Sequence, residues 1–213
     1  MTDLNPQAKQ MADESMVRNL EAQARAIWPQ EVALFRRYGL PLQPRILDAG
    51  CGTGDTTLFF AARGLNVTGI DFVEEAIRRA KAKAEERKIS AEFLVKDAMT
   101  LVEWDRRFES VIDSGLFHVY ENPADQERYV SGLAHVLRPG GRLYLYGFSD
   151  KEPSAPGGGI SRRDLENAFS EGWEIVSVQV VPGEINPAFA AEHPEEYPNR
   201  EPKMIFAIIS RTA

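Results

Sequence analysis

The chain has 213 residues, of which 43% are hydrophobic and 27% charged, a composition typical of a folded globular protein. Its 25 basic and 32 acidic residues give a formal net charge of −7, which argues against a nucleic-acid partner because such surfaces need clustered positive charge. The single cysteine, Cys51, excludes an internal disulfide and fits a reducing compartment, so we expect a cytoplasmic protein.

The sequence also argues against a membrane protein. A transmembrane helix needs about 20 consecutive apolar residues, and the uncharged apolar runs here are short, such as residues 204–209. Residues 1–6 have neither a basic start nor an apolar stretch. We therefore expect neither a membrane span nor a signal peptide.

Strand and helix patterns alternate along the middle of the chain. Residues 1–44 have apolar residues at helical spacing and predict a helical N-terminal segment before the main domain, residues 45–213. Strands are expected over 45–48, 66–71, 91–96, 108–113 and 142–148. Helices are expected over 55–63 and 73–87, and from Pro123 to a Pro139-Gly140-Gly141 turn. This alternation predicts an α/β fold with a doubly wound, mostly parallel sheet.

The C-terminal part follows a different pattern. Ser161 is expected to cap a short helix ending at Phe169, and residues 173–181 and 203–210 are expected to pair as an antiparallel edge hairpin. These strands bring the sheet to seven. The connection over 182–202 contains five prolines and five glutamates. It is either a solvated excursion or a lid beside the substrate.

The strongest chemical signal is a glycine-rich turn between the first strand and the first helix of the domain. Its sequence is Asp48-Ala49-Gly50-Cys51-Gly52-Thr53-Gly54. Alternate glycines let the backbone turn tightly and let a ligand approach the main chain. Asp71 ends the second strand, where a carboxylate can accept hydrogen bonds from both hydroxyls of a ribose. The two features together predict a site for an adenosine-type cofactor.

This turn resembles the first motif of the class I S-adenosylmethionine-dependent methyltransferases. Four later segments are similar to the family's following motifs, in the same order, over residues 45–148: Gly69-Ile70-Asp71-Phe72, Lys96-Asp97-Ala98, residues 108–114, and Leu137-Arg138-Pro139-Gly140-Gly141. The resemblance implies a Rossmann-like fold and S-adenosyl-L-methionine as the cofactor. Residues 113–118 and 148–150 look like bacterial enzymes that methylate small molecules, with the thiopurine, tellurite and heterocyclic-toxin methyltransferases as neighbours.

The resemblance also implies roles for residues near the amino-acid end of the cofactor. Gly50, Cys51 and Gly52 would lie against its methionine part, and Asp48 would orient the ammonium group. The backbone at Ser114-Gly115 would approach the same end. A nucleophilic role for Cys51 is disfavoured because no base is adjacent in sequence.

A second group would bind the adenosyl end. Asp71 would bind the ribose hydroxyls, Phe72 would cover one adenine face, and Asp97 would accept from the adenine amino group beside the Ala98 backbone. The structural alternatives are core packing for Phe72 and a turn role for Asp97.

Two residues after the fourth strand are candidates for the methyl-acceptor side. His118 is the candidate general base, because a histidine titrates near neutrality and ligands bind beyond the carboxyl ends of parallel strands; the alternative is that it caps the next helix. Tyr120 either orients the substrate or packs in the core. Trp28, Phe35 and Tyr38 either roof the site or pack on the sheet edge.

No metal site is expected. The three histidines, His118, His135 and His193, share no close spacing, and Cys51 is near none of them in sequence.

The predicted function is transfer of a methyl group by in-line displacement to an O, N or S nucleophile of a small organic molecule, by a monomer or homodimer. A nicotinamide-dependent oxidoreductase is disfavoured, because position 55 is Asp where G-x-G-x-x-G needs its third glycine. A non-catalytic S-adenosylmethionine-binding protein and a protein or RNA methyltransferase stay open as competing functions.

Overall fold

The computed structural model describes residues 45–153, 155, 158–183, 191 and 201–212. The N-terminal helical segment expected over 1–44, with Trp28, Phe35 and Tyr38, lies outside the described residues, as do His193 and most of the 182–202 connection. The possible roof and lid therefore stay predictions.

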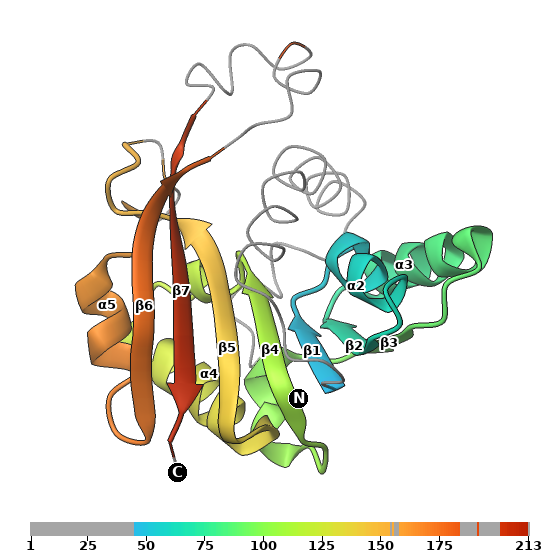
Figure 1. The fold of residues 1–213 in the computed structure, drawn as a ribbon, viewed down its shortest axis with the longest axis horizontal. Helices are drawn as coiled ribbons and strands as arrows, with labels where there is room; N and C mark the ends of the chain where they lie inside the picture. The colour runs from blue at the N-terminus through green and yellow to red at the C-terminus, as the bar shows by residue number, and fades with distance from the viewer. Residues whose placement is uncertain (1–44, 154, 156–157, 184–190, 192–200, 213) are drawn as a thin grey trace.

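One mixed sheet of seven strands forms the centre of the molecule (Figure 1), in the order β3-β2-β1-β4-β5-β7-β6. The strands are β1 Arg45–Ala49, β2 Asn66–Asp71, β3 Glu92–Val95, β4 Phe108–Ser114, β5 Leu137–Phe148, β6 Trp173–Pro182 and β7 Lys203–Arg211. Strands β1 to β5 are parallel, and β7 runs antiparallel between β5 and β6. The predicted doubly wound sheet with an antiparallel edge pair is confirmed.

Four α-helices are described, and α4 and α5 begin at side-chain caps. They are α2 Asp55–Ala61, α3 Glu74–Arg87, α4 Pro123–Val136 and α5 Arg162–Ala168, with 3-10 turns η1 Ala98–Glu103 and η2 Phe117–Val119. The Asn122 side chain accepts from the Asp125 amide at the start of α4. Ser161 and Asp164 form a reciprocal capping box at the start of α5.

Strand β5 is longer than expected. It begins at Leu137, so the Pro139-Gly140-Gly141 turn predicted to separate helix from strand belongs to the strand itself. Leu137 pairs with Phe108 before the register shifts, and regular pairing resumes between Arg142 and Ser110. A Cβ on Gly141 would stand 2.9 Å from the Glu109 carbonyl oxygen, so a glycine lets this irregular segment lie close against β4.

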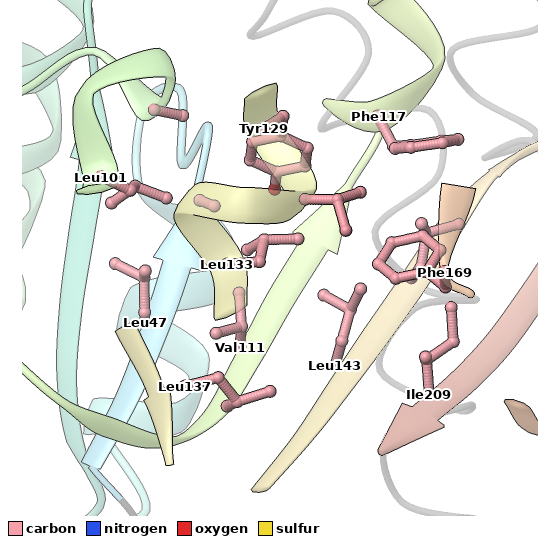
Figure 2. Close-up of a cluster of buried hydrophobic side chains, with 14 of the residues drawn as sticks. Leu47, Leu101, Val111, Phe117, Tyr129, Leu133, Leu137, Leu143, Phe169 and Ile209 are labelled. Atoms are coloured by element: carbon pink, nitrogen blue, oxygen red, sulfur yellow. The ribbon is translucent and has the colours of Figure 1, made fainter. Parts of the chain in front are cut away.

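The two faces of the sheet are covered by different helices. Helices α4 and α5 pack with β1, β4, β5 and β7 into the largest buried cluster, which includes Leu47, Val111 and Leu133 (Figure 2). On the opposite face α2 and α3 bury Leu58 and Ile77 against Phe93 of β3. With both faces covered, the carboxyl ends of the parallel strands remain as the edge where polar side chains converge.

Candidate functional site

The glycine-rich turn runs from the end of β1 to the start of α2. Gly50, Gly52 and Gly54 all have positive φ, at 72°, 52° and 86°. A Cβ on Gly54 would lie 2.8 Å from the Ala80 methyl of α3 and from the Phe93 ring. The third glycine therefore lets helix α3 pack directly behind the turn, as well as permitting a left-handed backbone.

The turn is tied to the end of β2. The Gly52 amide donates to Asp71 Oδ2 at 2.9 Å, and the Cys51 amide donates to the Ile70 carbonyl at 2.8 Å. Asp71 Oδ1 accepts from the Val73 amide at 2.8 Å. Burial raises the pKa of Asp71. A carboxylate has about four lone-pair sites, so Asp71 keeps acceptor capacity beside these backbone bonds, which fits a ribose diol.

Lys83 of α3 holds the other half of the turn. Its Nζ donates to Thr53 Oγ1 at 2.8 Å and to Asp55 Oδ2 at 2.9 Å. Thr53 is buried and Asp55 is the first residue of α2. Sequence reasoning missed Lys83 because it lies 30 residues from Thr53 and no local pattern marks the contact.

Asp48 is fully buried at the end of β1, on the α2 side of the sheet. Its Oδ2 accepts from the Thr57 hydroxyl at 2.6 Å. Burial raises the pKa of Asp48 to about 7, with the charges of Asp71 and Asp113 adding to the rise. A buried carboxylate beside two others favours a cationic ligand group, which fits the ammonium group expected there.

Asp113 is a third buried carboxylate, at the end of β4, and was not among the predicted site residues. It accepts from the Leu116 amide at 2.8 Å, the Phe117 amide at 3.1 Å and the Tyr129 hydroxyl at 2.9 Å. Burial raises its pKa to about 6. Asp113 thereby fixes the turn that follows β4. Its place at a strand end, like those of Asp48 and Asp71, is the signal that could have identified it.

The turn after β4 faces the glycine-rich turn. A Cβ on Gly50 would lie 3.2 Å from Leu116 Cβ, so Leu116 covers Gly50. Ser114 is half-buried, and the Gly115 amide donates to the Tyr146 carbonyl of β5 at 2.8 Å. The structure thus brings Ser114-Gly115 near the same edge as Asp48 and Gly50.

His118 points toward β5. Its ring lies edge-on to Phe148 with centroids 6.1 Å apart, and its Nδ1 is 3.5 Å from the position a Cβ would take on Gly147. This Nδ1 is buried and has no hydrogen-bond partner among the described residues. Burial lowers the pKa of His118 to about 4, so the ring is neutral at pH 7. The side chain that caps the next helix, α4, is Asn122 rather than His118.

Tyr120 lies deeper, with 1% of its surface exposed. Its ring packs against Tyr129 at a centroid distance of 5.1 Å. The same buried cluster contains Ala98 and Met99 of η1. The Tyr120 hydroxyl has no hydrogen-bond partner in the described part of the chain.

The residues expected at the adenine end lie beyond β2 and β3. Asp97 caps η1 by accepting from the Met99 amide at 2.9 Å, and Ala98 is buried. Phe72 is half-buried and packs against Val73 and Ala76. Asp97 and Phe72 therefore have the structural roles that were the alternatives to cofactor binding, and their places at the strand ends are compatible with both.

Two further features bear on the chemistry. Burial raises the pKa of the Cys51 thiol well above its usual range, which keeps it protonated and disfavours a nucleophilic role.

Within the described ranges, no group of three or more His, Cys, Asp or Glu residues could hold a metal ion. His135 instead contacts the Trp104 carbonyl through Nε2 at 3.1 Å.

No helix in the part of the chain that the structure describes is both long and apolar enough to cross a membrane.

The fold is Rossmann-like with a candidate adenosyl-cofactor site at this edge, and comparison with known proteins gives its class. Residues 46–141 match a family model described as "Methyltransferase domain". An uncharacterized methyltransferase of Schizosaccharomyces pombe is 34% identical over 113 residues, covering 53% of this chain and 77% of the relative. The chain therefore belongs to the class I S-adenosylmethionine-dependent methyltransferases, and S-adenosylmethionine is its cofactor.

Two more similar proteins are informative. The 2-heptyl-1-hydroxyquinolin-4(1H)-one methyltransferase of Mycobacteroides abscessus is 33% identical over 136 residues, covering 61% of this chain and 59% of that protein. A solved structure concerned with conversion of a disulfide bond into a thioacetal group during echinomycin biosynthesis is 29% identical. The two structures superpose with a TM-score of 0.71, and the match covers 86% of this chain and 81% of the other chain.

We predict that Lys83→Met weakens the binding of S-adenosylhomocysteine about threefold to tenfold, because Thr53 and Asp55 lose a shared charge-assisted donor. Calorimetric titration measures the change. Lys81→Met, an exposed position on the same helix, is the control and should bind normally. Equal affinity in the two variants would contradict the role assigned to Lys83.

We predict that the cofactor-free protein loses stability relative to Asp48→Asn as pH rises from about 5 to about 7.5. The pKa of Asp48 is raised to about 7 by burial, so over this range the folded state holds a proton that the unfolded state has released. His118, with its pKa lowered to about 4, has the opposite effect below about pH 6.5, but it is common to both proteins. Denaturant unfolding at several pH values gives the free energy of unfolding of each protein. If this free energy changes with pH equally in the wild type and in Asp48→Asn, the prediction is wrong.

Proposed function

We propose that this chain transfers the methyl group of S-adenosylmethionine to an O, N or S nucleophile of a small organic molecule. The observation that carries the proposal is the glycine-rich turn bonded through Gly52 to Asp71 at the carboxyl ends of β1 and β2. The methyltransferase from Mycobacteroides abscessus is named for a hydroxyquinolinone, which supports a small acceptor. The net charge of −7 favours such an acceptor over a nucleic acid.

The cofactor residues divide between the two ends of the bound molecule. Asp48, the Gly50-Cys51-Gly52 turn and the Ser114-Gly115 backbone would hold the amino-acid end, where the buried carboxylate meets an ammonium group. Asp71 would bind the ribose hydroxyls. Phe72, Asp97 and Ala98 would enclose the adenine.

When bound, S-adenosylmethionine supplies an already activated methyl group on a sulfonium centre. The task of the chain is therefore to align the acceptor behind that methyl group and to exclude water. A base is needed only where the nucleophile must lose a proton. Phe148 and the neutral ring of His118 contact each other and would border the acceptor on the β5 side of the site.

His118 is the proposed base. Its buried Nδ1 is an unused acceptor among the described residues, and a neutral imidazole can take a hydrogen bond, then a proton, from an acceptor O–H or N–H. The lowered pKa makes His118 a weak base in the free protein. It therefore suits a proton that becomes acidic only as the nucleophile is methylated.

The proposed function is tested by calorimetric titration with S-adenosylmethionine, S-adenosylhomocysteine and NADH, followed by methyl-labelled cofactor with phenols, thiols and N-heterocycles. We expect both sulfur compounds to bind, NADH not to bind, and label to enter at least one acceptor class. Binding of NADH alone would overturn the proposal in favour of an oxidoreductase. Cofactor binding without transfer to any acceptor, including protein and RNA, would favour a non-catalytic binding protein.

We predict that His118→Gln lowers kcat about 100-fold or more for an acceptor that must lose a proton, the usual size of a general-base contribution. It should leave the dissociation constant for S-adenosylhomocysteine unchanged. With an acceptor that is already an anion at the assay pH, kcat of His118→Gln should fall much less, because no proton has to be removed. This comparison separates base catalysis from positioning.

The control for this variant is His135→Gln, because His135 lies on α4 against the Trp104 carbonyl. It should keep normal turnover with both kinds of acceptor. Normal turnover of a protic acceptor by His118→Gln would remove His118 as the base.

A further inference from the structure

The loop after β4 presents two buried polar atoms without partners among the described residues, His118 Nδ1 and the Tyr120 hydroxyl. His118 Nδ1 faces Gly147 and Phe148 of β5. Tyr120 packs instead in the cluster that contains Ala98 and Met99 of η1. Sequence reasoning left Tyr120 either orienting the substrate or packing in the core, and in the structure its ring packs against Tyr129 whereas the His118 ring lies against Phe148.

Tyr120 is held firmly in this position. Its carbonyl accepts from Gln126 Nε2 at 2.8 Å, which anchors the backbone to α4. Its ring packs against Tyr129, whose own hydroxyl is bonded to Asp113. Helix α4 is in turn attached to η1, because Arg128 Nε donates to the Met99 carbonyl at 3.0 Å. The phenol is thus fixed between the end of β4 and the start of η1.

The Tyr120 hydroxyl is unusual because it is buried without a hydrogen-bond partner among the described residues, although its neighbours are hydrogen-bonded. Buried hydroxyl groups almost always have a partner, and leaving one without costs free energy. Burial raises the pKa of Tyr120, and the charges of Asp113 and other carboxylates add to the rise. A phenol of this kind stays protonated and keeps a hydrogen to donate.

We propose that the Tyr120 hydroxyl binds the adenine ring of the cofactor by donating to a ring nitrogen. The inference rests on the proposed placement of adenine against Asp97 and Ala98. Adenine carries an amino donor and several ring-nitrogen acceptors. Asp97, an acceptor, suits the amino group, and the Ala98 backbone lies beside it on the same edge. Tyr120 would supply a donor to a further ring nitrogen. Tyr120 is accordingly a cofactor-binding residue and does not contact the methyl acceptor.

The test is Tyr120→Phe, which removes one oxygen and keeps the ring. We expect the affinity for S-adenosylhomocysteine to fall about threefold to tenfold, as for loss of one net hydrogen bond. 5′-Methylthioadenosine, which keeps the adenosyl end and lacks the amino-acid end, should lose affinity by the same factor. The melting temperature of the cofactor-free variant should be unchanged or higher, because the variant no longer buries an unpartnered hydroxyl.

This combination of weaker binding with undiminished stability cannot arise from misfolding. The matched control is Tyr144→Phe, since Tyr144 is a buried tyrosine of β5 in a separate cluster with Phe206 and Ile208. It should bind both nucleosides as the wild type does. Unchanged nucleoside affinity in Tyr120→Phe would overturn the inference, and a raised KM for the methyl acceptor alone would return Tyr120 to the acceptor side. Failure of the wild type to bind S-adenosylhomocysteine would overturn both this inference and the proposed function.

Discussion

The hydrogen bond from the Gly52 amide to the Asp71 carboxylate is the contact on which the site depends. It joins the glycine-rich turn to the end of the neighbouring strand, and Asp71 also accepts from the Val73 amide as α3 begins. One side chain therefore sets the distance between the turn and the second strand, and fixes the entry into the helix that packs behind Gly54. A residue that binds ribose from this position is held rigid by the same bonds that shape the turn, so its geometry is set before any ligand arrives.

Three buried carboxylates at one sheet edge would be unfavourable without such bonding. Asp48, Asp71 and Asp113 each have a raised pKa because burial disfavours the charged form, and each is partly compensated by hydrogen-bond donors. In the proposed placement the cationic cofactor supplies positive charge at this edge, whereas Lys83, which holds the turn, bonds Thr53 and Asp55. Burying these carboxylates therefore lowers the stability of the cofactor-free fold but favours binding of a cation, as expected where function and stability compete.

The sequence predicted the elements well because their signals are local. The Asn122-Pro123 start of α4 and the Ser161 cap of α5 are visible within four residues. The extension of β5 back to Leu137 was missed, because it depends on pairing with Phe108 across a register shift. The role of Lys83 was missed for the same physical reason, because its contact with Thr53, 30 residues away, depends on how α3 packs behind the turn. Asp113 differs: its bonds from the Leu116 and Phe117 amides are local, and only its bond from Tyr129 depends on the packing of α4.

The loop after β4 carries both of the proposed ligand contacts, His118 and Tyr120. η2 is a single 3-10 turn, and Tyr120 follows it with a non-helical backbone at φ −90° and ψ 89°. The His118 ring lies against Phe148 of β5 and the Tyr120 ring against Tyr129 of α4, while Phe117 enters the core. Asp113 bonds the Leu116 and Phe117 amides and so fixes the rotation of the whole turn about its axis. Asp113 and its donor Tyr129 therefore support the segment that carries both the proposed acceptor contact and the proposed adenine contact.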